Sequence, residues 1–354
     1  MIPIIYAPAN RTFDTMGLGT LPDCLSCSVT EVLNGAYDLD LVCAADGPRS
    51  EWLKPDYIVY APHDESNELQ PFRIYSVERT LDRRVTVKAH HVSYALNHTW
   101  CSPFAAGTLV YALNQLKAHM DPDSPFTFWT TRVVQASYTQ VTPATVRERL
   151  GGVRGSILDV YGGQYEWDHF KVTSHARRGA DNGVTIAYGK DLTALSLLTD
   201  DSSLVTKIYP YWYRDDTLVE IPDKVIGATV PSTLSYHRTR ALDMTDKFET
   251  QPTPAQLNTA ARSWLMANAV TEPVASVSAE YYPLWQAAGY EGLEHLARVH
   301  LGDTIRVDCR DLGVDVTTNV TGLTYDVLGE RYTGVTIGVR RGSLSTMLAD
   351  MARR

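Results

Sequence analysis

The stretch that decides the fold runs from Leu150 to Leu192 and reads LGGVRGSILDVYGGQYEWDHFKVTSHARRGADNGVTIAYGKDL. Its glycine pairs, Gly151-Gly152 and Gly162-Gly163, permit backbone with positive φ and bracket an apolar run that predicts a brief helix at 157–160. Two runs of alternating apolar and polar residues, 170–175 and 184–188, flank the turn Arg178 to Gly183. This pattern predicts a β-meander. No nucleophile, metal cluster or phosphate loop can be read from the stretch.

The residues before this stretch are mostly strand-like. The alternating runs predict strands at 4–7, 27–33, 36–43, 57–61, 72–77 and 85–93. Asn34-Gly35 is the strongest hairpin signal, because a type I′ turn needs positive φ at both central positions. Many short strands at regular spacing indicate a barrel or split barrel.

Helical and strand patterns alternate over the rest of the chain. The helix predicted at 108–119 places Leu109, Ala112, Leu113 and Leu116 on one face, and Asp121-Pro122 ends it. Further helices are predicted at 142–150, 252–266 and 343–353. Strands are predicted at 205–212, 217–221 and 274–282, and hairpins are predicted from 305–309, 314–320, 323–327 and 332–337.

The composition describes an ordered multidomain protein. The 354 residues are enough for two to four domains, and 44% hydrophobic with 21% charged residues is an ordinary globular balance. A net charge of -9 argues against stable binding of nucleic acid, which needs a basic surface. We expect solubility to be the main consequence of this charge, although an acidic channel would also let DNA slide through.

The cysteines and the amino terminus favour folding in a reducing compartment. Five cysteines in a long chain do not form a disulfide framework. The sequence from Met1 to Asn10 lacks the basic leader and apolar core of a signal peptide, and we expect no stable membrane insertion.

The possible metal motifs are incomplete. Cys24-x-x-Cys27 needs more ligands than Cys43 supplies, so small buried cysteines are the better interpretation. His90 and His91 are neighbours on a strand and point to opposite faces, so with His98 they are expected to be structural. In Glu294-His295 with His300 the histidines are five residues apart, which does not fit a helical zinc motif.

Other candidate sites are equally weak. Gly17-Leu-Gly19 and Gly189-Lys190 lack the remaining glycines of nucleotide loops. Turn and cap roles explain most of the carboxylate pairs, which are Asp38 with Asp40, Asp121 with Asp123, and Asp200 with Asp201. Tyrosine is common, with 20 against 7 phenylalanines, and 7 tryptophans accompany it. Such rings suit either sheet packing or a half-wet binding surface for sugar or protein. We therefore expect no catalytic, cofactor-binding or metal residues and no cofactor; partner-binding residues cannot be assigned.

The same segments carry a family resemblance. The motif Gly-Gly-x-x-Gly-Ser-x-Leu-Asp-x-Tyr-Gly-Gly-x-Tyr-Glu-Trp-Asp (151–168), with the Arg-Arg-Gly turn and Gly-Val-Thr-Ile-x-Tyr-Gly-Lys-x-Leu after it, resembles phage minor structural proteins of the tail tip, often labelled prophage tail endopeptidase. The match continues in order at 70–78, 85–96, 208–211, 242–249, 252–254, 300–307 and 326–332.

The resemblance implies a β-rich, multidomain α+β fold similar to the hubs of contractile tails. It places the first part of a first β-barrel at 1–100, an inserted α+β domain at 101–204 and a return to the first barrel at 205–238. A second α+β domain follows at 239–298, then a second small β-barrel at 299–341 and a C-terminal helix at 342–354. In such hubs, two barrel-like domains in each of three chains make a pseudo-sixfold ring.

The function that the resemblance implies is structural. We expect a homotrimeric tail-tip or baseplate hub, made and assembled in the bacterial host cytoplasm and carried at the virion tail tip. Its expected partners are the distal tail protein, tail tube or tape measure on one side and a tip fibre, spike or lysin on the other, with DNA only in passage. Larger family members continue into a peptidase or carbohydrate-active domain, whereas this sequence stops at Arg354, so we expect no enzyme activity. A tail-associated lysin and a receptor- or glycan-binding module are the alternatives.

Overall fold

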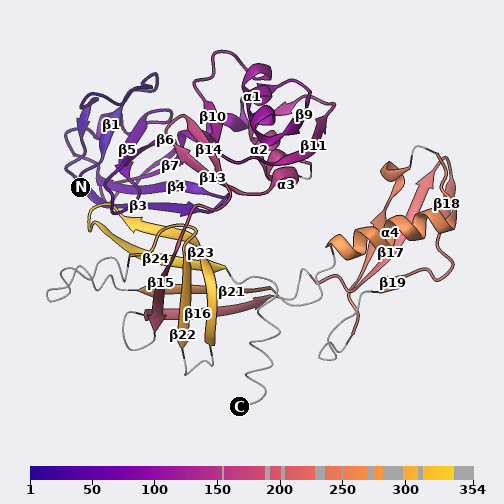
Figure 1. The fold of residues 1–354 in the computed structure, drawn as a ribbon. Helices are drawn as coiled ribbons and strands as arrows, with labels where there is room; N and C mark the ends of the chain where they lie inside the picture. The colour runs from indigo at the N-terminus through magenta and orange to yellow at the C-terminus, as the bar shows by residue number, and fades with distance from the viewer. Residues whose placement is uncertain are drawn as a thin grey trace. The chain divides into compact units, whose positions relative to one another are not determined.

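The computed structural model describes residues 1–153, 155–187, 192–200, 204–227, 236–248, 250–268, 274–281, 298–309 and 314–338 (Figure 1). The chain divides into two compact units. The first unit contains Met1–Leu195 and Ser278–Ile337, and the second contains Ser196–Val277 and Gly338–Arg354. As expected, the fold is β-rich with few helices.

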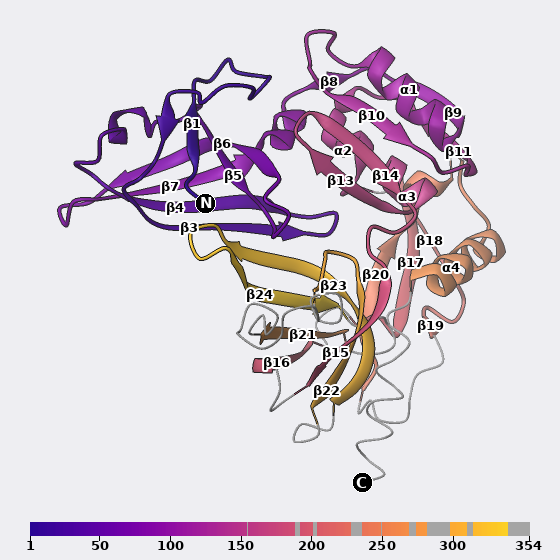
Figure 2. The same ribbon diagram turned by 60° about the vertical axis from the view of Figure 1, so that its left-hand side comes forward.

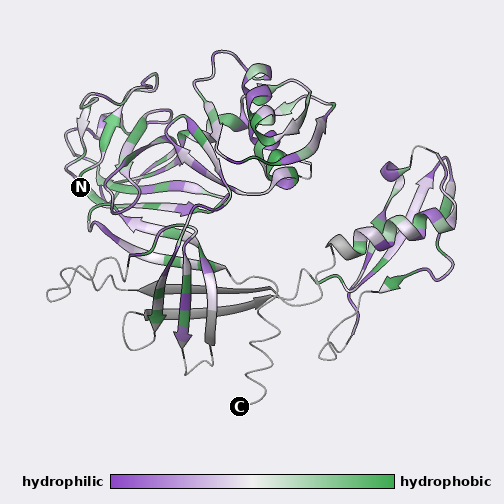
Figure 3. Ribbon diagram, in the orientation of Figure 1, coloured by the Kyte–Doolittle hydropathy of each residue, from purple (hydrophilic) through white to green (hydrophobic). Residues whose placement is uncertain are grey.

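The first unit begins with an antiparallel sheet whose strands lie in the order β3-β4-β7-β6-β5-β1-β2. Their bounds are β1 Ile4–Tyr6, β2 Gly19–Thr20, β3 Cys24–Val32, β4 Tyr37–Ala44, β5 Ile58–Pro62, β6 Leu69–Arg79 and β7 Arg84–His91, with short 3₁₀ helices η1 at Ser50–Trp52 and η2 at Val92–Asn97. Side chains alternate between core and surface: Tyr37, Leu39, Leu41 and Cys43 of β4 are all buried. Apolar and polar bands are visible along these strands in Figure 3. The predicted strands are therefore confirmed.

The predicted hairpin at Asn34-Gly35 is also confirmed, but not its turn type. β3 and β4 pair antiparallel from Cys24 with Cys43 to Glu31 with Tyr37. Asn34 has a φ of 57°, whereas Gly35 does not have positive φ. The connection is longer than a two-residue type I′ turn because Asn34 also binds a distant segment: its Nδ2 donates to the Gly163 carbonyl at 3.1 Å and its Oδ1 accepts from the Tyr165 amide at 2.8 Å.

A mixed segment follows within the first unit. Its elements are β8 Trp100–Cys101, β9 Phe104–Thr108, α1 Leu109–His119, β10 Thr127–Thr130, β11 Gln135–Gln140, β12 Ala144–Thr145, α2 Val146–Leu150, α3 Ile157–Tyr161, β13 Gln164–Asp168 and β14 Lys171–His175. The Thr108 hydroxyl caps α1 by accepting from the Tyr111 amide, and the four predicted apolar residues of this helix are buried. β14 lies between β13, which is antiparallel to it, and β10, which is parallel to it.

The β-meander predicted for 170–188 is wrong. The first of its two strands is β14, but the second, β15 (Asp181–Ala187), leaves that sheet and pairs in parallel with β22 (Thr304–Cys309). The connection carries the chain from the mixed segment to a different sheet. Tyr188, Gly189 and Lys190 lie outside the described residues.

The last part of the first unit completes the large sheet. β23 (Val314–Asp326) is a single long strand where two shorter ones were predicted, and β24 (Arg331–Gly338) pairs with it. β23 also pairs antiparallel with β3, Gly322 to Asp326 against Val32 to Ser28. Chain segments almost 300 residues apart thus form one continuous sheet (Figures 1 and 2). Strands β16 (Leu192–Asp200) and β21 (Val274–Tyr281) cross the boundary between the units.

The second unit has its own core. Its described elements are β17 Lys207–Arg214, β18 Thr217–Glu220, β19 Ile226–Gly227, β20 Thr239–Asp243, the 3₁₀ helix η3 at Thr245–Lys247 and α4 Pro254–Asn268. Leu257, Ala261 and Leu265 of α4 form one buried cluster with Ile208 and Trp212 of β17. The segment 205–238 contributes β17, β18 and β19 to a four-stranded sheet that β20 completes. The predicted terminal helix lies outside the described residues, and no described helix is long and apolar enough to span a membrane.

Candidate functional site

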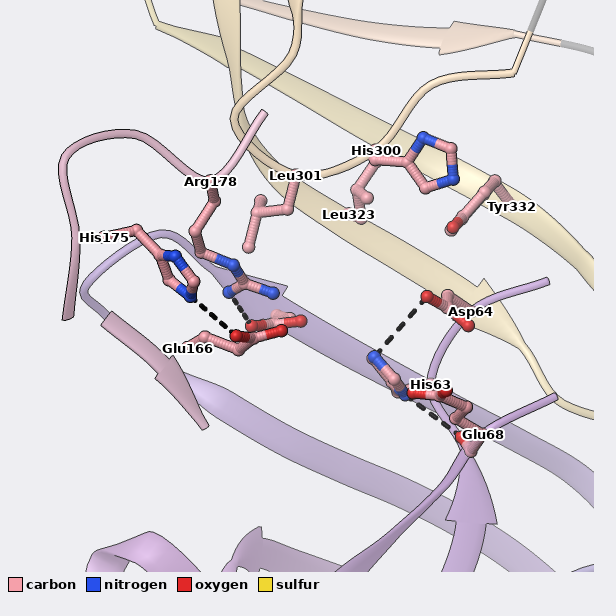
Figure 4. A pocket seen from close by; sticks show the side chains of 11 residues that line it. His63, Asp64, Glu68, Glu166, His175, Arg178, His300, Leu301, Leu323 and Tyr332 are labelled. Carbon is pink, nitrogen blue, oxygen red and sulfur yellow. Dashed lines mark hydrogen bonds and ion pairs between the residues drawn. The ribbon is translucent and has the colours of Figure 1, made fainter. Parts of the chain in front are cut away.

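A polar pocket of about 290 Å³ lies in the first unit, where three stretches of the chain meet (Figure 4). The lining residues come from β3, the β5–β6 loop, β13, β14 and the turn after it, and the segment from His300 to β24. They are Glu31, His63, Asp64, Glu68, Glu166, His175, Arg178, His300, Leu301, Leu323 and Tyr332. The pocket is therefore built by residues that are far apart in the sequence.

A buried ion pair joins β3 to the turn after β14. The Arg178 guanidinium donates to Glu31 through Nη1, and the side chains are only 14% and 8% exposed. Cys27, Val29 and Glu31 are alternate residues of β3, and all three are buried on the same face of the strand. Burial alone would lower the pKa of Arg178, but the facing Glu31 carboxylate raises it above its ordinary value. The charges stabilise each other in a position where either alone would be unfavourable.

Three histidines of the pocket each have an acidic neighbour. His175 Nε2 lies 2.7 Å from Glu166 Oε2, and His63 Nε2 lies 3.5 Å from Asp64 Oδ2. In Figure 4 the first pair lies beside Arg178 and the second at the other end of the pocket. The third, His300, has its Nδ1 3.4 Å from Asp303 Oδ2. Hydrogen bonding to Asp303 raises the pKa of His300.

Asp303 also ties the Arg178 turn to the last stretch of the chain. Its Oδ1 accepts from the Ala180 amide at 2.7 Å, and its Oδ2 accepts from the His300 amide at 2.8 Å. Although burial favours the neutral carboxyl, these bonds and His300 lower the pKa of Asp303. A Cβ on Gly179 would lie only 2.0 Å from the backbone of Gly302 and Asp303, so glycine is required for this approach.

The lining residues of the pocket favour a polar contact between three chain segments over a catalytic or metal site. Among its described lining residues there is no serine, threonine or cysteine to act as a nucleophile. In the parts of the chain that the structure describes, no three His, Cys, Asp or Glu side chains are grouped to hold a metal ion. A polar cavity of this size accommodates ordered water. We find here a set of mutually compensated charges that fixes three segments against one another.

Sequence reasoning missed this pocket except for His300. Glu31 was the available signal, because a glutamate in the apolar phase of an alternating strand requires a buried cation or donor. Its partner is 147 residues away, and no local pattern identifies it.

The histidine and carboxylate motifs have structural surroundings. His90 lies 2.7 Å from Asp38 Oδ1 and is stacked between the rings of Tyr75 and Tyr94. His91 is fully buried on the opposite face, where burial lowers its pKa well below the usual range. His98 is exposed at the end of η2. The structure thus separates the histidines, as the strand geometry predicts.

Of the remaining candidate site residues, some form turns or surface contacts and others lie outside the residues that the structure describes. Asp121 Oδ1 accepts from the Asp123 amide at 3.1 Å, which is a turn role, and Asp40 lies 3.8 Å from Lys88. Gly17 has a φ of 53° and closely approaches the Ile5 carbonyl, so its role is conformational. Glu294, His295 and Asp201 lie outside the described residues.

The aromatic residues are divided between the core and the surface. Tyr6, Tyr37, Tyr138 and Tyr325 are among the largest fully buried side chains, which is ordinary packing. Tyr75, Trp100 and Trp129 are about half exposed, at 50%, 54% and 51%. These exposed rings are compatible with a binding surface.

Comparison with known proteins connects this fold to phage tails. Residues 180–348 match the family model described as "Prophage endopeptidase tail". No curated protein sequence matches the chain.

Three solved structures are similar over nearly their full length. The prophage tail protein gp18 from Listeria monocytogenes EGD-e is 16% identical, with a TM-score of 0.55 and coverage of 100% of this chain and 99% of that one. The 43 kDa tail protein of prophage MuSo2 from Shewanella oneidensis is 13% identical, with a TM-score of 0.61 and coverage of 97% and 99%. The tail protein from Neisseria meningitidis MC58 is 11% identical, with a TM-score of 0.58 and coverage of 96% of each chain.

At these identities the structures establish a shared fold. The chain thus shares its β-rich fold with prophage tail proteins. The family match over residues 180–348 agrees with this likeness, since its description also names a prophage tail protein.

Proposed function

We propose that this chain is a homotrimeric hub at the tail tip, which adapts the sixfold distal tail to a threefold tip and surrounds the central channel. The observation that carries the proposal is the fold shared from end to end with prophage tail proteins. The hub would contact the distal tail protein, tail tube or tape measure on one side and a fibre, spike or lysin on the other. DNA would only pass through it, and the four domains and terminal helix predicted from the sequence remain part of this proposal.

The first unit has properties that suit such a role. Its large sheet joins β3 to β23, and the Arg178–Glu31 ion pair and the Asp303 hydrogen bonds fix the mixed segment to that sheet. Contacts between segments that are far apart in the sequence favour a unit that opens cooperatively rather than piece by piece. The role we assign is therefore geometric rather than catalytic.

The oligomeric state is the decisive test. Purified chain should have the mass of a trimer by size-exclusion chromatography with light scattering, and negative-stain images should show threefold rings. It should also co-purify with the distal tail protein of its own phage. A stable monomer that does not bind the distal tail protein would rule the hub out.

A lysin is the second candidate, because the matching family model carries "endopeptidase" in its description. We propose that this chain has no such activity. A peptidoglycan zymogram with the purified chain should show no clearing, alongside a known muramidase as positive control. Clearing that persists after further purification would establish the enzyme instead.

The half-exposed rings of Tyr75, Trp100 and Trp129 favour a third candidate, a receptor- or glycan-binding module. A glycan array separates this candidate from the hub. Specific binding that is lost in a Trp100→Ala or Trp129→Ala variant would favour the module, whereas a trimer without glycan binding favours the hub.

A further inference from the structure

Three thiols come together where the β3–β4 hairpin begins and ends. Cys24 of β3 is directly opposite Cys43 of β4, and their Sγ atoms are 3.8 Å apart. Cys27 is close enough to hydrogen-bond with Cys24. Cys24 is half-buried, whereas Cys27 and Cys43 are buried. The pocket described above contains none of these residues.

A β-bulge produces this alignment. Cys27 is paired with Leu41 and Ser26 with Val42, so a regular ladder would place Cys24 opposite Ala44. The register shifts between Cys24 and Ser26, which moves Cys24 opposite Cys43. The two thiols therefore face each other because of a local irregularity in the strand.

We propose that Cys24 and Cys43 form a redox-active pair that closes to an intramolecular disulfide when the folded protein meets a small-molecule disulfide oxidant. Directly opposed residues in an antiparallel sheet have Cα atoms about 4.5–5.5 Å apart, which lies within the roughly 4.4–6.8 Å that disulfides require. Rotation of the two side chains is then enough to bring the sulfurs together. This inference does not depend on the proposed tail function.

The exposure of the thiols sets the order of the steps. The half-buried Cys24 is the accessible sulfur, so its thiolate attacks one sulfur of oxidised glutathione and releases one glutathione thiol. The Cys43 sulfur then attacks Cys24 in the mixed disulfide and releases the second glutathione. The protein loses two protons and two electrons, and oxidised glutathione gains them to become two thiols. Hydrogen bonding with Cys27 raises the pKa of Cys24, so the reaction should be slow at neutral pH and accelerate at higher pH.

Cys27 is the competing partner for Cys24, because its thiol is within hydrogen-bond distance. Cys27 is paired with Leu41, however, whereas Cys43 is the residue directly opposite Cys24. The buried Cys101 is a matched control, because its Sγ contacts the Ser102 carbonyl and no described cysteine.

The test is peptide mapping of the folded, full-length chain. Reduced protein is incubated with excess oxidised glutathione at about pH 8, quenched with acid and digested without reduction. We expect intact protein that is two hydrogen atoms lighter and a Cys24–Cys43 linked peptide. The same product is expected from Cys27→Ser and Cys101→Ser but not from Cys43→Ser, in which glutathione should remain attached to Cys24.

Thermal unfolding gives an independent measurement. Oxidised wild type should melt several degrees above the reduced protein, because the bond constrains the unfolded hairpin, and dithiothreitol should reverse the shift. A Cys24–Cys27 linked peptide, or a mixed disulfide on Cys24 that never closes in folded wild type, would overturn the proposal. The wild-type mapping decides the question even if a variant fails to fold.

Discussion

The buried ion pair between Arg178 and Glu31 should account for a large share of the stability of the first unit. Arg178→Met keeps most of the side-chain volume but leaves the Glu31 carboxylate, 8% exposed, without its cation. Removing one member of a buried pair typically destabilises a protein by about 3–5 kcal/mol. The 3.4 Å hydrogen bond from Arg178 to the Tyr165 carbonyl is lost as well. The adjoining pocket lets water reach Glu31, so we expect the lower end, about 3 kcal/mol.

The measurement is urea unfolding followed by circular dichroism, with hydrogen exchange to locate the effect. Amides of 177–187 and 304–309 should lose protection before those of α4 in the second unit, because the ion pair lies where β15 joins β22. The control is the double variant Glu31→Leu with Arg178→Met, which removes both charges and should recover most of the lost stability. The reasoning fails if Arg178→Met stays within about 1 kcal/mol of wild type, or if the double variant is as unstable as the single one.

Three further predictions concern neighbouring contacts. Gly179→Ala places a Cβ against the backbone of Gly302 and Asp303, so it should lower the free energy of unfolding in urea by at least about 2 kcal/mol. The control is Gly107→Ala, whose Cβ meets nothing within 4 Å and which should be as stable as wild type. Equal stabilities of the two variants would contradict the close approach at Gly179. His300 has a raised pKa, so its bond to Asp303 should stabilise the fold fully below about pH 6.5 and less as pH rises through the folded-state value. The unfolding difference between wild type and His300→Asn should therefore shrink with rising pH, with the exposed His98→Asn as control; a difference that grows with pH would reverse the assignment. Asn34→Gly accepts the positive φ but removes the hydrogen bonds to Gly163 and Tyr165, so the free energy of unfolding should fall by about 1–3 kcal/mol. Asn34→Ala should lose more stability, because alanine is strained at positive φ. A stability of Asn34→Gly equal to that of wild type would show that these bonds do not contribute.

Local pattern was enough to find the strands and several of their connections. The alternation in β4 gives its buried face directly, and Asn34-Gly35 marks the β3–β4 hairpin. The apolar positions after Thr108 predict α1, although Thr108 is the N-cap and not the first residue of the helix. In each case the determining residues lie within about one turn or strand of each other, so a short window contains the relevant physics.

Pairing between distant strands could not be predicted in this way. The run at 184–187 fits a meander with β14 by alternation, but β10, a strand from much earlier in the chain, takes the edge of β14 that β13 leaves open, and β15 pairs with β22 instead. The turn type at Asn34 was misjudged for a similar reason, because its side chain binds Gly163 and Tyr165, about 130 residues later. Tertiary contacts override the local preference at both positions.

The polar contacts between the 178–180 turn, Glu31 and the 300–304 segment limit how these segments can be arranged. An apolar contact between the 178–180 turn and the 300–304 segment would be stable in several arrangements, whereas the Arg178–Glu31 pair and the Asp303 acceptors are satisfied in only one. Both edges of β14 are paired with β13 and β10, and we expect these charges to hold the 178–180 turn in the one arrangement that leads β15 to β22. The Glu31→Leu, Arg178→Met double variant tests this separately from stability. It should unfold near the wild-type urea concentration but show heterogeneous exchange at the β15 amides, and a single, wild-type exchange pattern there would refute the inference.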